Sequence, residues 1–255
     1  MGVEYRSGTG HNTWLETAES SWSTAWDLPD DVNLIMCMVT NFYAYTEYAP
    51  TYDSVAFDLL ATSDSNNARQ RLYALWAPPT DSDYTISITW TASFKYWCAR
   101  FVAFSGAKMD GISSISKVES TDWNGTQVSK PGDMVALWAV NRATGNPTLA
   151  WDSPGTNRFN IRNDSDGNGE MQSGMATYPG LASTPIGALS GGDGIHTHIM
   201  YNNIEQEAGG SKMILVMSEI YDRIRKNRKE IGVGDIGGFG LSGNLWKPET
   251  GLVTI

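Results

Sequence analysis

The chain has 255 residues, of which 41% are hydrophobic and 18% are charged. This length suits one large all-β domain or two small domains. No stretch is long and apolar enough for a membrane-spanning helix, and residues 1–10 lack the basic start and apolar stretch of a secretion signal. Acidic side chains outnumber basic ones by 28 to 18, and the resulting net charge of −10 disfavours binding to nucleic acid.

Strand periodicity runs through most of the chain. Apolar side chains alternate over 55–59 and 86–90, which predicts half-buried strands. Other runs are apolar on both faces and predict strands that are covered on two sides. These runs are 34–39, 97–104, 134–140 and 213–217. Turn-forming segments rich in Pro, Gly and Asp separate the runs, so the pattern predicts an all-β fold of eight to ten strands.

Two regions depart from this pattern. Residues 141–194 are rich in Gly, Asn, Asp, Ser and Pro, which predicts a long polar loop insertion, and the apolar pairs Leu149 and Trp151, and Phe159 and Ile161, predict brief strands within it. Residues 218–231 have charged helical character, and six glycines follow within 232–243. Residues 1–220 carry 12 basic and 24 acidic groups, whereas 221–255 carry 6 and 4. We therefore predict a body over 1–221 and a basic, Gly-rich C-terminal arm over 222–255, and we detect no internal repeat of fixed period.

The two cysteines, Cys37 and Cys98, both lie in strongly apolar runs. A thiol in such a run packs as a small hydrophobe, so we expect both to be buried and reduced. A disulfide between neighbouring strands is the alternative, because sequence spacing does not fix spatial pairing.

A series of strand-like motifs follows the first two-sided run. They are Tyr52-Asp53-Ser54-Val55, 72–80 (LYALWAPPT), 84–90 (YTISITW) and 101–107 (FVAFSGA). Together with Leu34–Val39, this order resembles the jelly-roll β-sandwich domains of tailed-bacteriophage virion proteins. The resemblance covers about residues 30–140, with a last strand expected at 213–220. It implies a jelly-roll-like antiparallel β-sandwich and a virion protein of the capsid decoration or tail-associated type.

The motif with the clearest metal-binding pattern is Asp164-Ser165-Asp166-Gly167-Asn168-Gly169. Its alternating oxygen side chains match the first half of a helix-loop-helix calcium loop, with Asp164, Asp166 and Asn168 as ligands. Met175 stands at the twelfth position, where a bidentate glutamate is required. An unliganded turn is therefore the favoured interpretation, calcium is the alternative, and no other cofactor is expected.

Histidines and enzyme motifs give weaker signals. His196 and His198 lie on one side of a predicted strand, but no cysteine pair accompanies them, so a polar strand face or a subunit contact is favoured over zinc. The chain has no G-x-S-x-G, H-E-x-x-H or P-loop motif, which argues against an enzyme. Paired carboxylates of a glycan hydrolase would leave no linear motif. Trp90, Trp97 and Trp138 could stack on sugars, but their strand positions predict core packing.

A cluster of positive charge begins the C-terminal arm, which also carries apolar residues near its end. The cluster consists of Arg223, Arg225, Lys226, Arg228 and Lys229, and Trp246 is the aromatic residue of the arm. A solvated helix end would explain the charges. The alternative is an arm that docks on an acidic neighbouring protein with Trp246 as its anchor.

These observations give one leading functional prediction. We expect a non-enzymatic virion protein, made in the host cytoplasm, that decorates and cements the capsid by binding the major capsid protein or another virion protein. It would be a homo-oligomer, with a trimer as one arrangement. The alternatives are a tail or fibre module that binds a receptor or carbohydrate, and a glycan hydrolase.

Overall fold

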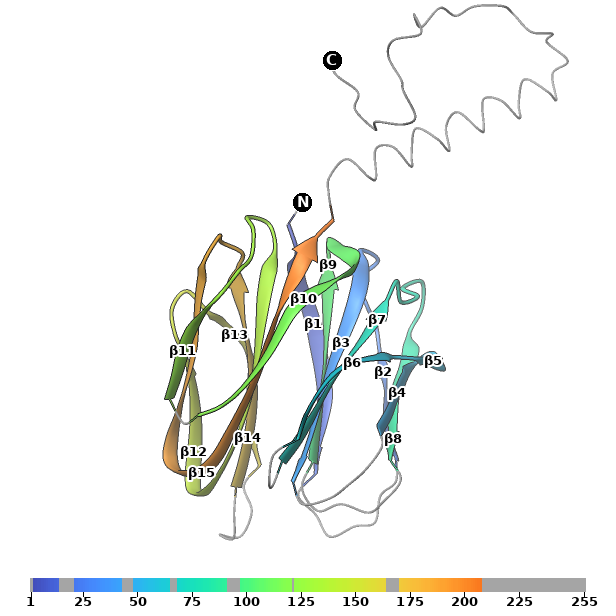
Figure 1. The fold of residues 1–255 in the computed structure, drawn as a ribbon. Coiled ribbons are helices and arrows are strands. Elements are labelled where there is room, and N and C mark those ends of the chain that lie inside the picture. The colour runs from blue at the N-terminus through green and yellow to red at the C-terminus, as the bar shows by residue number, and fades with distance from the viewer. Residues whose placement is uncertain are drawn as a thin grey trace, which may run out of the picture. The chain divides into compact units, whose positions relative to one another are not determined.

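The structure is a computed structural model that describes residues 2–13, 21–42, 48–64, 68–90, 97–120, 122–163 and 170–207. These residues form fifteen strands and no helix, so the described part contains no helix that could span a bilayer. All strand pairs are antiparallel, and three sheets stack in layers (Figure 1). The predicted all-β antiparallel sandwich is confirmed. The predicted strand 213–217 and the boundary at 221 lie outside the described residues.

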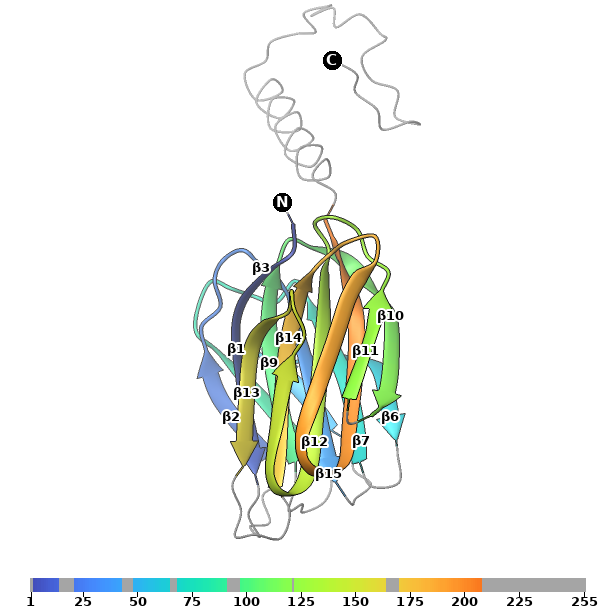
Figure 2. The same ribbon diagram turned by 90° about the vertical axis from the view of Figure 1, so that its left-hand side faces the viewer.

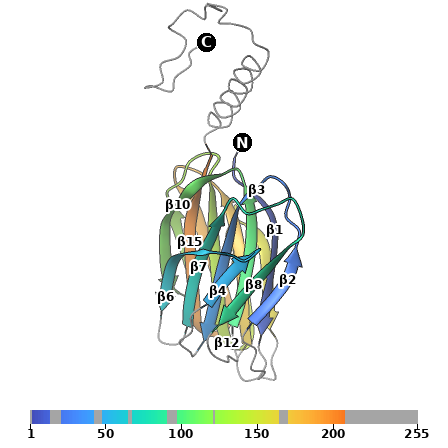
Figure 3. The ribbon, with the colours of Figure 1, turned by 90° about the vertical axis from the view of Figure 1, so that its right-hand side faces the viewer.

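The first half of the chain forms a jelly roll. Its strands are β1 (Glu4–Thr13), β2 (Ser21–Trp26), β3 (Val32–Phe42), β4 (Tyr48–Tyr52), β5 (Val55–Ala56), β6 (Asp58–Asp64), β7 (Ala68–Trp76), β8 (Tyr84–Trp90) and β9 (Trp97–Ser105). Sheet A has the order β1-β9-β3-β7-β6 and sheet B the order β2-β8-β4-β5 (Figure 3). Without β6, these are the two four-stranded leaves of an eight-stranded jelly roll.

The second half forms sheet C, which packs on the other face of sheet A (Figure 2). Its strands are β10 (Ala107–Glu119), β11 (Asp122–Gln127), β12 (Met134–Trp151), β13 (Thr156–Asn163), β14 (Glu170–Pro179) and β15 (Thr184–Gln206). The order β10-β15-β12-β14 repeats the order β1-β9-β3-β7 of sheet A. The register between β12 and β15 shifts between Thr144 and Thr148, and the start of β15 pairs with β11.

The two halves are therefore tandem rolls of the same strand order. In the second, β12 and β15 are long enough for their far ends, together with β11, to supply most of an outer leaf. Asn41 of β3 and Asn141 of β12 are both buried. The first lies opposite Trp97 in β9 and the second opposite Thr197 in β15. The topology repeats although we detected no periodic sequence, because a roll requires a pattern of buried positions and not particular residues.

The prediction of a long polar loop at 141–194 was wrong, but the brief strands predicted around 149–151 and 159–161 are present in β12 and β13. Most of this region belongs to β12, β13, β14 and β15. Its backbone groups pair with neighbouring strands, so small and polar side chains do not prevent strand formation. Residues 172–178 of β14 are all buried although only some of them are apolar. Their environment, between two other strands of sheet C, determines the conformation more than their composition does.

Three hydrophobic cores explain the runs that are apolar on both faces. Along β3, Ile35, Cys37 and Val39 face the core between sheets A and B. The alternate residues Leu34, Met36 and Met38 face the core between sheets A and C. A third core lies on the other side of β12 and includes Val135 and Leu137. The predictions of two-sided burial for 34–39, 97–104 and 134–140 are confirmed, because β3, β9 and β12 each lie between two cores.

The prediction of a single half-buried strand over 55–59 was wrong. Residues 55–59 alternate in sequence, but Val55 and Leu59 are exposed (48% and 53%) and only Phe57 is buried. The chain leaves sheet B after β5 and enters sheet A at β6, so these residues do not share one strand. The half-buried strand predicted at 86–90 is confirmed, because Ile86, Ile88 and Trp90 of β8 are all buried.

Both thiols are buried and free, as predicted. Cys37 belongs to the core between sheets A and B. Cys98 lies on the opposite face of β9 from Trp97 and Ala99, and it contacts Ser173 of sheet C. Because the two sulfurs lie on opposite faces of sheet A, they cannot form a disulfide without rearranging the sheet.

Candidate interaction surface

The residues predicted to carry function lie outside the described residues. They are Asp164, Asp166 and Asn168 of the predicted calcium loop, the basic residues Arg223, Arg225, Lys226, Arg228 and Lys229, and Trp246. The structure does describe the strands that flank the first group: β13 ends at Asn163 and β14 begins at Glu170. The two segments that flank the motif are therefore paired antiparallel strands and not the two helices of a helix-loop-helix calcium site. Among the described residues, no group of three metal-ligating side chains is brought together.

The histidine pair does not form an exposed strand face. His198 is 2% exposed, between sheets A and C, and its Nδ1 lies 3.7 Å from a carboxylate oxygen of Glu119. A buried imidazole cannot contact another subunit, so this part of the sequence interpretation was wrong for His198. The side chain of His196 lies outside the described residues.

Polar side chains replace apolar ones at one end of the interface between sheets A and C. Arg100 of β9 is 5% exposed, and its guanidinium lies 5.5 Å from the ring centre of Phe159. Burial lowers the pKa of Arg100 and raises the pKa of the neighbouring Cys98 thiol. Gln70 Nε2 donates to the His198 carbonyl at 3.5 Å. These groups join the two rolls internally and do not present a surface to a partner.

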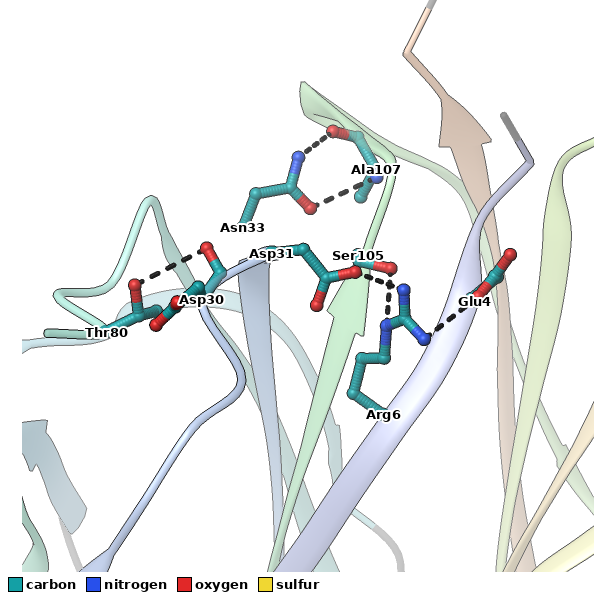
Figure 4. Close-up of polar contacts among 8 residues, drawn as sticks. All are labelled: Glu4, Arg6, Asp30, Asp31, Asn33, Thr80, Ser105 and Ala107. Carbon is teal, nitrogen blue, oxygen red and sulfur yellow. Dashed lines mark hydrogen bonds and ion pairs between the residues drawn. The ribbon is translucent and has the colours of Figure 1, made fainter. Parts of the chain in front are cut away.

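At the opposite end of the strands, an arginine links three segments of the first roll (Figure 4). Arg6 Nε donates to Ser105 Oγ at 2.9 Å, and its guanidinium pairs with Asp31 and with Glu4, the latter at 3.1 Å. Beside it, Asn33 Nδ2 donates to the Ala107 carbonyl at 2.6 Å and Asn33 Oδ1 accepts from the Ala107 amide. The cluster fixes the point where the chain passes from the first roll to the second.

Aspartates surround this end of sheet B. Asp27, Asp53 and Asp83 are all exposed and act on Tyr52, whose hydroxyl donates to the Trp26 carbonyl at 3.1 Å. Burial, the nearby Tyr84 and these carboxylates together raise the pKa of Tyr52 to about 12. The rim of the first roll is therefore strongly negative, in agreement with the net charge.

The outer face of sheet B is different because it carries small, uncharged side chains. Ser21, Ser23 and Ala25 of β2 are exposed, as are Thr85 and Thr89 of β8. Ser23 lies opposite Ser87, whose hydroxyl lies 2.7 Å from that of Thr51 in β4. β2 forms one margin of the sheet, since among the described strands it pairs only with β8. This margin, Ser21–Trp26, has no charged side chain, and we call it the neutral edge.

Four of the eight tryptophans in the described part of the chain are buried, and the three that were predicted to pack in the core are among them. Trp90, Trp97 and Trp138 are at most 5% exposed. Trp123 of β11 is one of the partly exposed tryptophans: it stacks on Tyr201 of β15 at 4.9 Å and an interplanar angle of 26°, and both residues pack against the third core while remaining partly exposed. A stacked pair of this kind can present one aromatic face to a flat ligand.

Comparison of the chain with family models, with curated proteins and with solved structures finds no match. Sequence reasoning missed the neutral edge because each of its residues is ordinary. The available signal was the stretch 21–26, six residues without charge, proline or glycine in an acidic protein. It becomes informative only when the structure places that stretch at a sheet margin.

Proposed function

We propose that the protein is a non-enzymatic structural subunit of a phage virion, which decorates and stabilises the capsid. Jelly rolls are a recurrent architecture of viral capsid domains, and most of the motifs that carry the resemblance lie in β3–β9 of the first roll, whereas the resemblance as a whole covers about residues 30–140 and so extends into β10–β12. Decoration acts by adhesion: each subunit bridges coat proteins, so that more contacts must break before the shell opens.

The observation that carries this proposal is the division of the chain. The residues of the three hydrophobic cores all belong to the compact unit Met1–Ala208. The five basic residues of 223–229 and Trp246 belong to the following unit, Gly209–Ile255. An acidic folded body joined to a basic segment with an aromatic anchor suits a subunit that binds through its C-terminal segment.

Co-sedimentation with capsids of the virus that encodes the chain tests the proposal. The full chain should bind stripped capsids and raise the temperature at which they release DNA. A chain that lacks 222–255 should keep its β-sheet circular dichroism but lose binding, and Trp246→Ala should weaken binding. Undiminished occupancy by the truncated chain would show that the arm does not hold the shell.

Lectins also use jelly rolls, and the stacked Trp123–Tyr201 pair favours a carbohydrate-binding tail or fibre module as the second candidate. A glycan array distinguishes the two candidates. Binding that is lost in Trp123→Ala and kept in Trp22→Ala, a tryptophan at the other margin of the molecule, would favour the tail module. Release of reducing sugar from a bound glycan would instead support a glycan hydrolase.

A further inference from the structure

Sheet margins are where folded β proteins are open to further pairing. A strand at a margin leaves half of its amide and carbonyl groups without a partner in its own sheet. Natural proteins protect such strands with charged side chains, bulges, glycine or short length. The described part of this chain has several margins, and comparing them identifies the one that is not protected.

The margins of sheets A and C carry these protections. β1 and β6 contain charged residues and register shifts, and so do β10 and β13. β11 begins with Asp122 and has Gly125 near its centre, and β5 has only two residues. Each of these strands therefore resists the addition of another strand by charge repulsion, by irregular backbone or by lack of length.

The neutral edge has none of these protections. Its sequence is Ser-Trp-Ser-Thr-Ala-Trp, and its pairing with β8 is regular from Ser21 to Trp26, without a bulge. Trp22 is stacked on Phe101 at 6.1 Å and packs against the core between sheets A and B. A regular and uncharged margin that is anchored on the core is suited to accept a further strand.

We propose that the neutral edge pairs antiparallel with the neutral edge of a second copy, joining two B sheets into one continuous eight-stranded sheet across a twofold axis. The absence of charged side chains in 21–26 is our reason for proposing a second copy as the partner. Two molecules of net charge −10 repel one another, and the repulsion is smallest where the paired residues are uncharged, so that Asp27, which follows the strand, is the nearest exposed carboxylate described in each copy. The partner presents the same neutral strand, so the contact is self-complementary.

The pleat of the strand limits the register. Keeping the exposed serines of both copies on the outer face requires that residues of like parity lie opposite each other. The axis therefore passes through Ser23 or through Thr24. In either register the two Ser23 side chains lie within roughly 8 Å of one another. The contact is small compared with an ordinary dimer interface, so it is a weak, reversible one. A twofold contact gives even-numbered oligomers and not the trimer expected from sequence.

The closing experiment measures the oligomeric state of the full chain in solution, without capsids, by sedimentation velocity over roughly 1–200 µM. Wild-type protein should form a reversible dimer. Ser23→Lys places two like charges close together and should weaken dimerisation at least tenfold. The matched control is Thr89→Lys, the same change on the same face but one strand inward. Thr89 lies opposite Ser21, so its two charges would be separated by three strand spacings and by at least four residues along the strand, about 20 Å or more, which is beyond the Debye length of ~8 Å, and the dimer should persist.

Further outcomes decide the question. Hydrogen exchange over 21–26 should slow with protein concentration in wild type and Thr89→Lys but not in Ser23→Lys. If Ser23→Lys does not fold, Ala25→Lys makes the same test. A wild-type monomer at every concentration, a trimer, or a dimer unaffected by either edge variant would overturn the proposal. If Ile214→Lys also abolished the dimer, the neutral edge would pair with the 213–217 segment of the second copy and not with its neutral edge, which would overturn the proposal. Failure of capsid binding leaves this result unchanged, so the two proposals fail separately.

Discussion

Single buried tyrosines connect the packing of the rolls to pH. Tyr178 of β14 is 0% exposed, and its hydroxyl donates to the Gly187 carbonyl at 2.7 Å. Burial raises its pKa to about 12, opposed in part by the hydrogen bond that the Gly187 amide donates to the Tyr178 oxygen at 3.3 Å. In the unfolded chain the phenol ionises near pH 10, whereas in the folded protein it stays neutral. The stabilisation is therefore complete below pH 10 and is lost as the pH rises towards 12.

Replacing Tyr178 separates the contribution of its hydrogen bond to stability from the contribution of its ionisation. Tyr178→Phe should lower the free energy of unfolding at pH 7 by about 1–2 kcal/mol, because the Gly187 carbonyl loses its hydroxyl partner. Between pH 10 and 12 the variant should lose less stability than the wild type, because one ionising group has gone. Guanidinium unfolding at pH 7, 10 and 11.5 measures both effects. An equal alkaline loss in the two proteins would mean that Tyr178 does not contribute to this transition.

Individual strands differ in how many of their faces are buried, and the loss in free energy of unfolding caused by substitutions on each face should reflect this. In β3, Ile35 faces sheet B and Met36 faces sheet C, and both are 0% exposed. In β8, Ile88 is 0% exposed but Thr89 faces solvent. Substitution of Ile35, Met36 or Ile88 by Ala should each cost about 2–5 kcal/mol, and Thr89→Ala less than about 0.5 kcal/mol.

Chemical denaturation of the four variants checks this expectation. Two successive large losses in β3, against one large and one negligible loss in β8, are the result expected if sheet A is the middle layer. A negligible loss in Met36→Ala would contradict burial of sheet A by sheet C, because that face would then be open to water.

Sequence patterns predicted those strands whose environment is simple. Residues 34–39, 97–104 and 134–140 are apolar on both faces because each strand lies between two cores. The strands of 141–194 were missed because hydrogen bonding to neighbours, which composition does not record, fixes their backbone. The candidate site residues, which belong to the calcium motif at 164–168, the basic cluster at 223–229 and Trp246, lie outside the described residues. The neutral edge depends on which strand is last in its sheet, and that is a property of the topology and not of residues 21–26.

At the scale of the whole molecule, two jelly rolls pack with their four-stranded leaves in opposite order. β1 of sheet A lies beside β13 of sheet C, where the Arg158 guanidinium lies 4.6 Å from the centre of the Tyr5 ring. On the other side, Lys117 of β10 donates to the Thr62 carbonyl of β6. At the end of the strands, the Val3 amide donates to Gly132 and the Glu207 amide to Gly106, both at 2.8 Å. Each roll therefore contacts the other along both sides and at one end of the strands.

Salt should act in opposite directions on the two contacts proposed for this molecule. Raising NaCl from about 20 to 300 mM shortens the Debye length from roughly 20 Å to about 6 Å. Dimerisation through the neutral edge brings two acidic bodies together without compensating ion pairs, so screening should strengthen it several-fold. Docking of the basic 223–229 cluster on an acidic shell relies on opposite charges, so the same change should weaken it. Sedimentation velocity and capsid co-sedimentation at matched salt concentrations measure the two trends, and a dimer that weakens with salt would indicate that charged groups, not the neutral edge, form its interface.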